Sequence, residues 1–144
     1  MRWKKLLKTA SALIRMNGKL LVDTNVVVAL FASDPSALQR LASGPELFLC
    51  VPVLGELRYG ALASSRVEQN LTRLDRFAQS VRILPCDAET VLYYSAIRLS
   101  LRKKGRPLPE NDIWIAAVAQ QHGLTLLSRD SHFRQVDGLE TESV

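Results

Sequence analysis

Short runs of apolar residues recur along the chain, and longer stretches of mixed apolar and polar positions separate them. A short apolar run bounded by polar or turn-forming residues is typical of a strand that is buried on both faces of a sheet. Such runs predict strands at Lys19–Val22, Leu47–Val51, Val81–Leu84 and Leu124–Leu127, and the tail around Leu139 is a candidate for a fifth.

The stretches between these runs place apolar residues three or four positions apart, which is the periodicity of a helix with one buried face. Two of the stretches begin with an aspartate that can cap a helix, Asp34 before Pro35 and Asp87 before a segment that closes in a basic run. The predicted helices are Thr24–Ser33, Asp34–Gly44, a helix that opens at Pro52, Arg66–Ser80, Asp87–Gly105 and Asn111–His122.

Strands therefore alternate with helices from Lys19 to the end of the chain. This alternation, with strands that are apolar throughout, predicts a three-layer α/β fold, in which helices cover both faces of a central parallel sheet of four to five strands. In open sheets of this kind, ligands bind at the carboxyl ends of the strands. Residues at which strands end are consequently the first candidates for a functional site.

The composition agrees with a single globular domain. Of the 144 residues, 47% are hydrophobic and 23% are charged, as in soluble globular proteins. No apolar run approaches the roughly 20 residues that a membrane-spanning helix needs, which argues against a membrane protein. Cys50 and Cys86 lie inside or beside apolar runs and are predicted to be buried free thiols, which fits a reducing, cytoplasmic location.

The net charge of +5 is unevenly distributed along the chain. Six of the 19 lysines and arginines lie in residues 1–19, which contain no acid, so residues 20–144 carry 13 basic and 14 acidic residues. We interpret residues 1–15 as a basic leader: a short helix, a targeting segment, or the result of a start codon assigned upstream of Met16. Residues 16–144 are then a single domain, whose own charge gives no argument for binding nucleic acid.

Four acidic residues stand at positions that suggest a common site. Asp23 ends the first predicted strand and Asp130 follows the fourth, although an aspartate after a strand also commonly caps the next helix. Asp112 lies in the first turn of a helix that is apolar on all sides, where Asn111 can be the cap. Asp112 is then available for another role, or simply complements the helix dipole. Glu56 borders the apolar stripe of its helix, where it could also be an ordinary surface residue.

The joint pattern is more informative than any one of these acids. Carboxylates that share a crevice repel each other unless a divalent cation binds among them. A site of oxygen donors without histidine or cysteine favours a hard ion, Mg²⁺ or Mn²⁺. Such ions promote hydrolysis of phosphodiester bonds, because they activate water, orient the phosphate and offset charge on the leaving oxygen. Asp23, Glu56, Asp112 and Asp130 are therefore predicted to form a metal site suited to this chemistry.

The segments around these four acids resemble the motif blocks of PIN-domain ribonucleases, and most of all those of the VapC-type toxins of bacterial and archaeal toxin–antitoxin pairs. The resemblance extends from about Lys19 to Phe133 and keeps the order and spacing of the blocks. The blocks in this chain are Leu21–Asn25 (LVDTN), Glu56–Gly60 (ELRYG), Glu110–Ala117 (ENDIWIAA) and Leu127–Phe133 (LSRDSHF).

The resemblance implies a PIN-like, Rossmann-like fold and an endoribonuclease that depends on Mg²⁺ or Mn²⁺ and cleaves RNA. By position, it implies that Asp23, Asp112 and Asp130 hold the metal. It also implies that Glu56, the fourth catalytic residue, holds a water on the metal or a second ion.

The resemblance further implies partners and supporting residues. Thr24 or Asn25, together with Ser128, would support the carboxylates. The chain would form a homodimer and would have a cognate antitoxin whose tail blocks the active site. The basic leader departs from the family pattern, in which the first strand comes within a few residues of the start.

Three other functions remain open from the sequence. The chain could be a solitary PIN-domain RNase of RNA processing, or a non-catalytic, regulatory RNA-binding module on the same fold. A phosphotransferase of the haloacid dehalogenase type also starts from an aspartate after its first strand. That chemistry requires a second acid two residues later, where this chain has Asn25.

The histidines and several arginines have weaker assignments. His122 and His132 are the only histidines, and both are predicted to have structural roles rather than to act as general bases. Arg58, Arg129 and the run Arg102–Arg106 are candidates for contacts with RNA phosphates, although residues of this kind are more often solvated surface charges.

Overall fold

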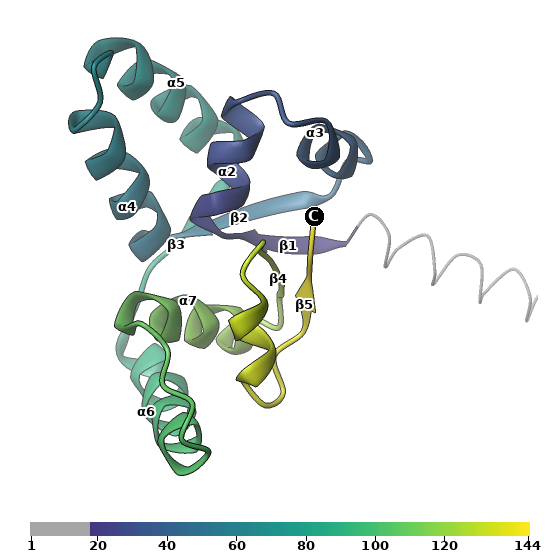
Figure 1. The fold of residues 1–144 in the computed structure, drawn as a ribbon, viewed down its shortest axis with the longest axis vertical. Helices are drawn as coiled ribbons and strands as arrows, with labels where there is room; N and C mark the ends of the chain where they lie inside the picture. Colours follow the sequence, from purple (N-terminus) through teal and green to yellow (C-terminus); the bar gives the residue numbers. More distant parts are fainter. Residues whose placement is uncertain (1–17) are drawn as a thin grey trace, which may run out of the picture.

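The computed structural model describes residues 18–144, so the leader predicted at residues 1–15 lies outside the described part of the chain. Its five strands form one sheet in the order β3-β2-β1-β4-β5, and all neighbouring strands are parallel (Figure 1). The strands are β1 Lys19–Val22, β2 Glu46–Cys50, β3 Arg82–Leu84, β4 Thr125–Leu127 and β5 Thr141–Glu142. The predicted parallel sheet is thus confirmed.

The helices lie where the periodicity of the sequence predicts them. They are α2 Thr24–Phe31, α3 Pro35–Ala42, α4 Val51–Leu62, α5 Val67–Ser80, α6 Ala88–Lys103 and α7 Glu110–Gln121, with a 3-10 helix η1 at Ser131–Gln135. The side chains of Asp34 and Asp87 accept hydrogen bonds from backbone N–H groups in the first turns of α3 and α6, so both aspartates cap their helices as predicted.

The helices form two layers, one on each face of the sheet, with α2 to α5 on one side of the strands and α6 and α7 on the other (Figure 1). The strand order explains this division. The chain adds β2 and β3 on one side of β1, and then crosses back to add β4 and β5 on the other side. Because crossovers between parallel strands are right-handed, reversing the direction places the later helices on the opposite face.

This reversal positions the functional site. β1 is central and pairs with β4, and the backbone N–H of Asp23, just after β1, donates to the carbonyl oxygen of Leu127 at 2.9 Å. Helix α7, whose residues Ile115–Ala119 are fully buried, packs beneath these strands. Ligand sites of open α/β sheets lie where the strand order reverses, at the carboxyl ends of the strands. In this fold that place is the end of β1 and β4.

Two strands differ from the sequence prediction. The fifth strand lies at Thr141–Glu142 rather than around Leu139. Strand β3 is at the edge of the sheet and its first two residues, Arg82 and Ile83, are exposed, although the sequence predicts a strand that is buried like the others. An apolar run indicates a strand, but it does not tell whether the strand has a neighbour on each side.

The two cysteines also differ from each other. Cys50, at the end of β2, is a buried free thiol as predicted. Cys86 is exposed, so the prediction of a buried thiol is wrong there, because this residue lies in the loop between β3 and α6. Burial raises the pKa of the Cys50 thiol to about 12, which leaves it unreactive near neutral pH.

None of the described helices is long and apolar enough to cross a membrane.

Candidate active site

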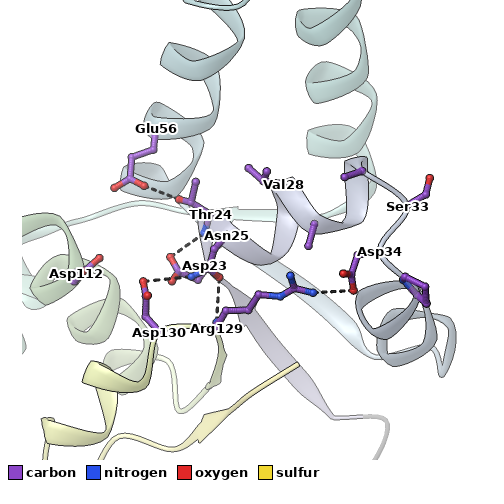
Figure 2. Close-up of a pocket in the computed structure, with 13 residues that line it drawn as sticks. Asp23, Thr24, Asn25, Val28, Ser33, Asp34, Glu56, Asp112, Arg129 and Asp130 are labelled. Atoms are coloured by element: carbon purple, nitrogen blue, oxygen red, sulfur yellow. Dashed lines mark hydrogen bonds and ion pairs between the residues drawn. The ribbon is translucent and has the colours of Figure 1, made fainter.

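The four acids singled out from the sequence line one cavity of about 820 Å³ (Figure 2). They come from four different elements: Asp23 follows β1, Glu56 is on α4, Asp112 is in the first turn of α7, and Asp130 follows β4. The structure therefore brings together residues that are more than 100 positions apart in the sequence, from Asp23 to Asp130. The cavity lies at the carboxyl ends of β1 and β4, as the fold predicts.

Asp23 is the most buried of the four, with 4% of its surface exposed. Its Oδ1 accepts a hydrogen bond from the backbone N–H of Thr24 at 2.8 Å, and its Oδ2 accepts one from the hydroxyl of Ser128 at 2.7 Å. Burial raises the pKa of this carboxyl, the two hydrogen bonds oppose the rise, and the charges of Asp112 and Asp130 add to it. Asp23 therefore has two roles: it caps α2, and it is one of the four acids that line the cavity.

Asp112 is half-buried and contacts a residue that the sequence reasoning missed. Its Oδ2 lies 2.8 Å from Nε2 of His132. Burial raises the pKa of the Asp112 carboxyl, the contact with His132 opposes this, and the nearby charges of Asp130 and Glu56 raise the pKa further. The structural role predicted for His132 did not include this contact. Its position two residues after Asp130, in the same block, was the only available signal.

Glu56 is held by one hydrogen bond on each carboxylate oxygen. Thr24 donates from its hydroxyl to Oε2, and Asn111 donates from its amide to Oε1, both at 2.7 Å. The predicted role of Asn111 as a helix cap is wrong, because α7 begins one residue earlier and Pro109 takes the cap position. The Asn111 side chain instead positions an acid of the neighbouring helix, so Glu56 is not an ordinary surface residue.

Asn25 organises the loop that carries Asp130. Its amide nitrogen donates to Oδ2 of Asp130 at 3.3 Å and lies 3.5 Å from the hydroxyl of Ser128, while its carbonyl oxygen accepts from the backbone N–H of Arg129 at 3.1 Å. Asp130 precedes η1 but its side chain makes no capping hydrogen bond, so the alternative of a simple helix cap finds no support there. Thr24, Asn25 and Ser128 thus each support a different acid.

The donor set fits a hard divalent cation, although it is not a complete coordination shell. In residues 18–144, no group of three or more His, Cys, Asp and Glu side chains is arranged to hold a metal ion by itself. Mg²⁺ in nucleotide-processing sites is generally held by one or two carboxylates, with waters and substrate phosphates as the other ligands. Burial raises the pKa values of Asp23 and Asp112, and the neighbouring acids raise them further, so a cation bound among these carboxylates would relieve their repulsion.

The burial of the Asp112 carboxyl, together with repulsion from the neighbouring acids, predicts that Asp112→Asn stabilises the metal-free protein. Because the folded-state pKa of Asp112 is raised, its ionised form opposes folding. That destabilisation is absent at pH values below the carboxyl's usual pKa and develops as the pH rises through the folded-state pKa. In EDTA near pH 7, Asp112→Asn should therefore melt higher than wild type by on the order of 3 °C, and the difference should disappear in acid.

Thermal melts over a pH series measure this difference. Asp137→Asn is the matched control, because the pair with Lys104 lowers the pKa of Asp137, so its neutralisation should lower the melting temperature or leave it unchanged. A lower melting temperature for Asp112→Asn at pH 7 would mean that the ionised Asp112 carboxylate does not oppose folding.

Comparison with known proteins gives one consistent result. The sequence profile of the PIN domain family matches residues 20–139, a range that contains all four acids. Ribonuclease VapC2 of Rickettsia felis is 30% identical over 128 residues, which cover 85% of this chain and 96% of that protein. The tRNA(fMet)-specific endonuclease VapC of Shigella flexneri is 30% identical over 127 residues, covering 86% of this chain and 96% of that protein.

Solved structures also resemble this fold. In the crystal structure of VapBC2 from Rickettsia felis bound to a DNA fragment from their promoter, one chain superimposes with a TM-score of 0.80 at 30% sequence identity. The match covers 88% of this chain and 98% of that chain. The similarity in sequence and the similarity in structure each cover more than four fifths of this chain.

Proposed function

Because this chain belongs to the PIN-domain family, we propose that it is an endoribonuclease that depends on Mg²⁺ or Mn²⁺ and acts as the toxin of a toxin–antitoxin pair. The observation that carries the proposal is the convergence of Asp23, Glu56, Asp112 and Asp130 on one cavity at the carboxyl ends of β1 and β4. The relatives supply the substrate class and the partner, since they are named ribonucleases and are solved as VapBC complexes.

Each acid has a part in the proposed reaction. Asp23, Asp112 and Asp130 would hold the metal, which when bound supplies a positive charge that lowers the pKa of water and offsets charge on the phosphate. Glu56 would orient the attacking water, because Thr24 and Asn111 restrain its carboxylate.

The supporting residues reduce the freedom of these acids before RNA binds. Ser128 and the backbone of Thr24 fix both oxygens of Asp23, and Asn25 fixes the loop of Asp130. Preorganised groups of this kind stabilise a transition state without having to rearrange during the reaction. The buried position of Asp23 strengthens the effect, since water screens its charge poorly.

The proposed toxin would act in the cytoplasm as a homodimer, and an antitoxin would block the cavity. A solitary enzyme of RNA processing would use the same site and differs only in lacking the antitoxin. A non-catalytic RNA-binding module is disfavoured, because all four acids are present and line the cavity together. The phosphotransferase of the haloacid dehalogenase type is set aside by the match to the PIN family.

The proposal predicts that RNA cleavage requires a divalent cation. Purified protein should cut single-stranded RNA in Mg²⁺ or Mn²⁺, lose this activity to the level of the buffer blank in excess EDTA, and recover it when the metal is restored. Duplex DNA of similar length is the control and should be largely spared. Full activity in excess EDTA would contradict the proposal.

Metal binding can be measured without the reaction. An ion that binds only the folded protein raises the melting temperature, and the stabilisation grows with the logarithm of 1 plus the ratio of its concentration to Kd. Mn²⁺ should therefore stabilise wild type, and should stabilise Asp112→Asn much less. Equal shifts for both proteins would mean that Asp112 does not take part in metal binding.

A further inference from the structure

The cavity continues past the four acids toward the turn between α2 and α3 (Figure 2). Val28 and the segment Ser33–Pro35 line this second part. The side chain of Arg129 extends between the two parts, from the loop after β4 to Asp34 (Figure 2). The volume of about 820 Å³ is that of a site for a whole small-molecule ligand, so it has room for more than one phosphate group of an RNA strand.

Arg129 is held at both of its ends. Its backbone N–H donates to Asn25 at 3.1 Å, and its Nη2 lies 2.7 Å from Oδ1 of Asp34 and donates to the hydroxyl of Ser36 at 3.3 Å. Asp34 is itself fixed, because it caps α3 by accepting from the backbone N–H groups of Ser36 and Ala37. An arginine restrained in this way loses little conformational entropy when it binds a ligand.

The guanidinium retains donors for a ligand. Within the described residues, neither Nε nor Nη1 of Arg129 makes a hydrogen bond, and about a third of the side chain is exposed. Arg129 lines the cavity together with Asp23 and Asp130. The structure therefore presents unused charged donors at the wall of the candidate active site.

The cavity is strongly acidic, so a phosphate that enters it needs positively charged donors. Among the described residues that line it, five are acidic and Arg129 alone is basic; the acids are Asp23, Asp34, Glu56, Asp112 and Asp130. An RNA strand entering such a cavity brings further negative charge. A metal ion can offset the charge at the acids near β1, but a phosphate near α3 needs a separate cation.

We propose that Arg129 is a substrate-binding residue, whose guanidinium contacts a phosphate of the RNA strand that flanks the one being cut. Asp34 and Ser36 hold the guanidinium ready at the α3 side of the cavity. This assignment rests on the proposed function, since it supposes that RNA is the substrate. It distinguishes Arg129 from Arg58, which lies on α4 near Asp75 and does not line the cavity.

The competing explanation is that the ion pair of Arg129 with Asp34 only fastens the loop after β4 to α3. Two variants separate the explanations, because they break the same pair from opposite sides. Arg129→Gln removes the cation, whereas Asp34→Asn keeps the cation and also keeps the cap of α3, since asparagine caps helices well. Arg129→Lys retains the charge without the planar guanidinium, and Arg76→Gln, at an exposed position on α5, is the matched control.

Binding is measured by fluorescence anisotropy with a short fluorescein-labelled single-stranded RNA of mixed sequence, in EDTA and over a KCl series. Arg129→Gln should raise Kd about tenfold, as for loss of a charge-assisted contact. It should also reduce the slope of log Kd against log [KCl] by about 0.7, the value for one phosphate contact on a single strand. Arg129→Lys should keep the wild-type slope. Asp34→Asn should also keep that slope, because the cation remains, and should weaken binding less than Arg129→Gln does. Arg76→Gln should bind as wild type does.

The outcomes separate this inference from the function on which it rests. Unchanged Kd and slope in Arg129→Gln would overturn it, and so would equal weakening by Arg129→Gln and Asp34→Asn, which is the result expected of a structural pair. If wild type binds and cuts RNA while Arg129→Gln binds normally, only the role of Arg129 is wrong. If wild type neither binds nor cuts RNA, the proposed function itself fails.

Discussion

Replacing Asp23 or Asp112 with alanine will reduce the rate of RNA cleavage by on the order of a thousandfold or more, as expected when a preorganised charge at a metal site is lost. Asp23 is buried at the end of β1, and the hydroxyl of Ser128 fixes its carboxylate, so alanine removes a preorganised negative charge. Asp112 lies in the first turn of a buried helix and is the acid of that turn that lines the cavity.

Single-turnover cleavage of labelled RNA in Mn²⁺ measures these rates. A loss of activity through misfolding is excluded by Asp112→Asn, which should be more stable than wild type without metal and yet inactive. Asp75→Ala is the surface control, because this residue is exposed on α5 and should keep the wild-type rate. If Asp112→Asn cleaves within tenfold of wild type, the role of Asp112 as a metal ligand is wrong.

Expression of the wild-type chain without a partner will arrest bacterial growth, and the number of colonies formed under induction will fall by several orders of magnitude. The physical reason is catalysis: one enzyme molecule cleaves many RNA molecules, so a small amount of protein suffices. Co-expression of a small protein encoded beside this chain should restore growth, because an antitoxin that covers the cavity excludes RNA.

Plating assays with matched expression levels measure this effect. Asp112→Asn is the control, since it keeps the fold and the surface but removes the proposed activity. Arrest by both wild type and Asp112→Asn would show that toxicity does not come from RNA cleavage. Normal growth with wild-type protein that cleaves RNA in vitro would favour the solitary enzyme of RNA processing over the toxin.

Much of the fold could be predicted from local sequence. Buried strands such as β1 contact apolar groups on both faces, so after the exposed Lys19 the β1 residues Leu20–Val22 are all apolar and the run is visible in the sequence. The helices can be predicted from the periodicity of their apolar residues and from capping residues such as Asp34 and Asp87. Alternation of the two elements then predicts a parallel sheet, and a parallel sheet predicts where its site lies.

The positions of the four acids followed from the same reasoning. Asp23 and Asp130 were identified because they stand where strands end, and Asp112 because it is charged at the start of an otherwise apolar helix. Glu56 was identified because it borders an apolar stripe, which is weak evidence alone, and the resemblance to PIN-domain motifs supported it. These are local signals, since each depends only on a residue and its near neighbours in the chain.

The contacts among these residues were decided by the tertiary structure. Asn111 reads as a helix cap but reaches Glu56, 55 positions away, and His132 contacts Asp112, 20 positions away. Arg129 reads as a surface charge but pairs with Asp34 across the cavity. Local composition and periodicity do not reveal any of these pairs, because polar residues are common in loops and at helix starts whether or not they have a distant partner.

The sequence by itself thus determined the elements, their layers and the edge of the sheet that carries the acids. The tertiary structure decided the order of the strands, which put β3 at an exposed edge and brought the ends of β1 and β4 together. The physical reason is that apolar runs and helical periodicity depend on residues within one element. Which side chains meet across the cavity depends instead on how the elements pack against each other. Strand order joined Asp23 to Ser128 and Arg129 to Asp34, and with them built the site.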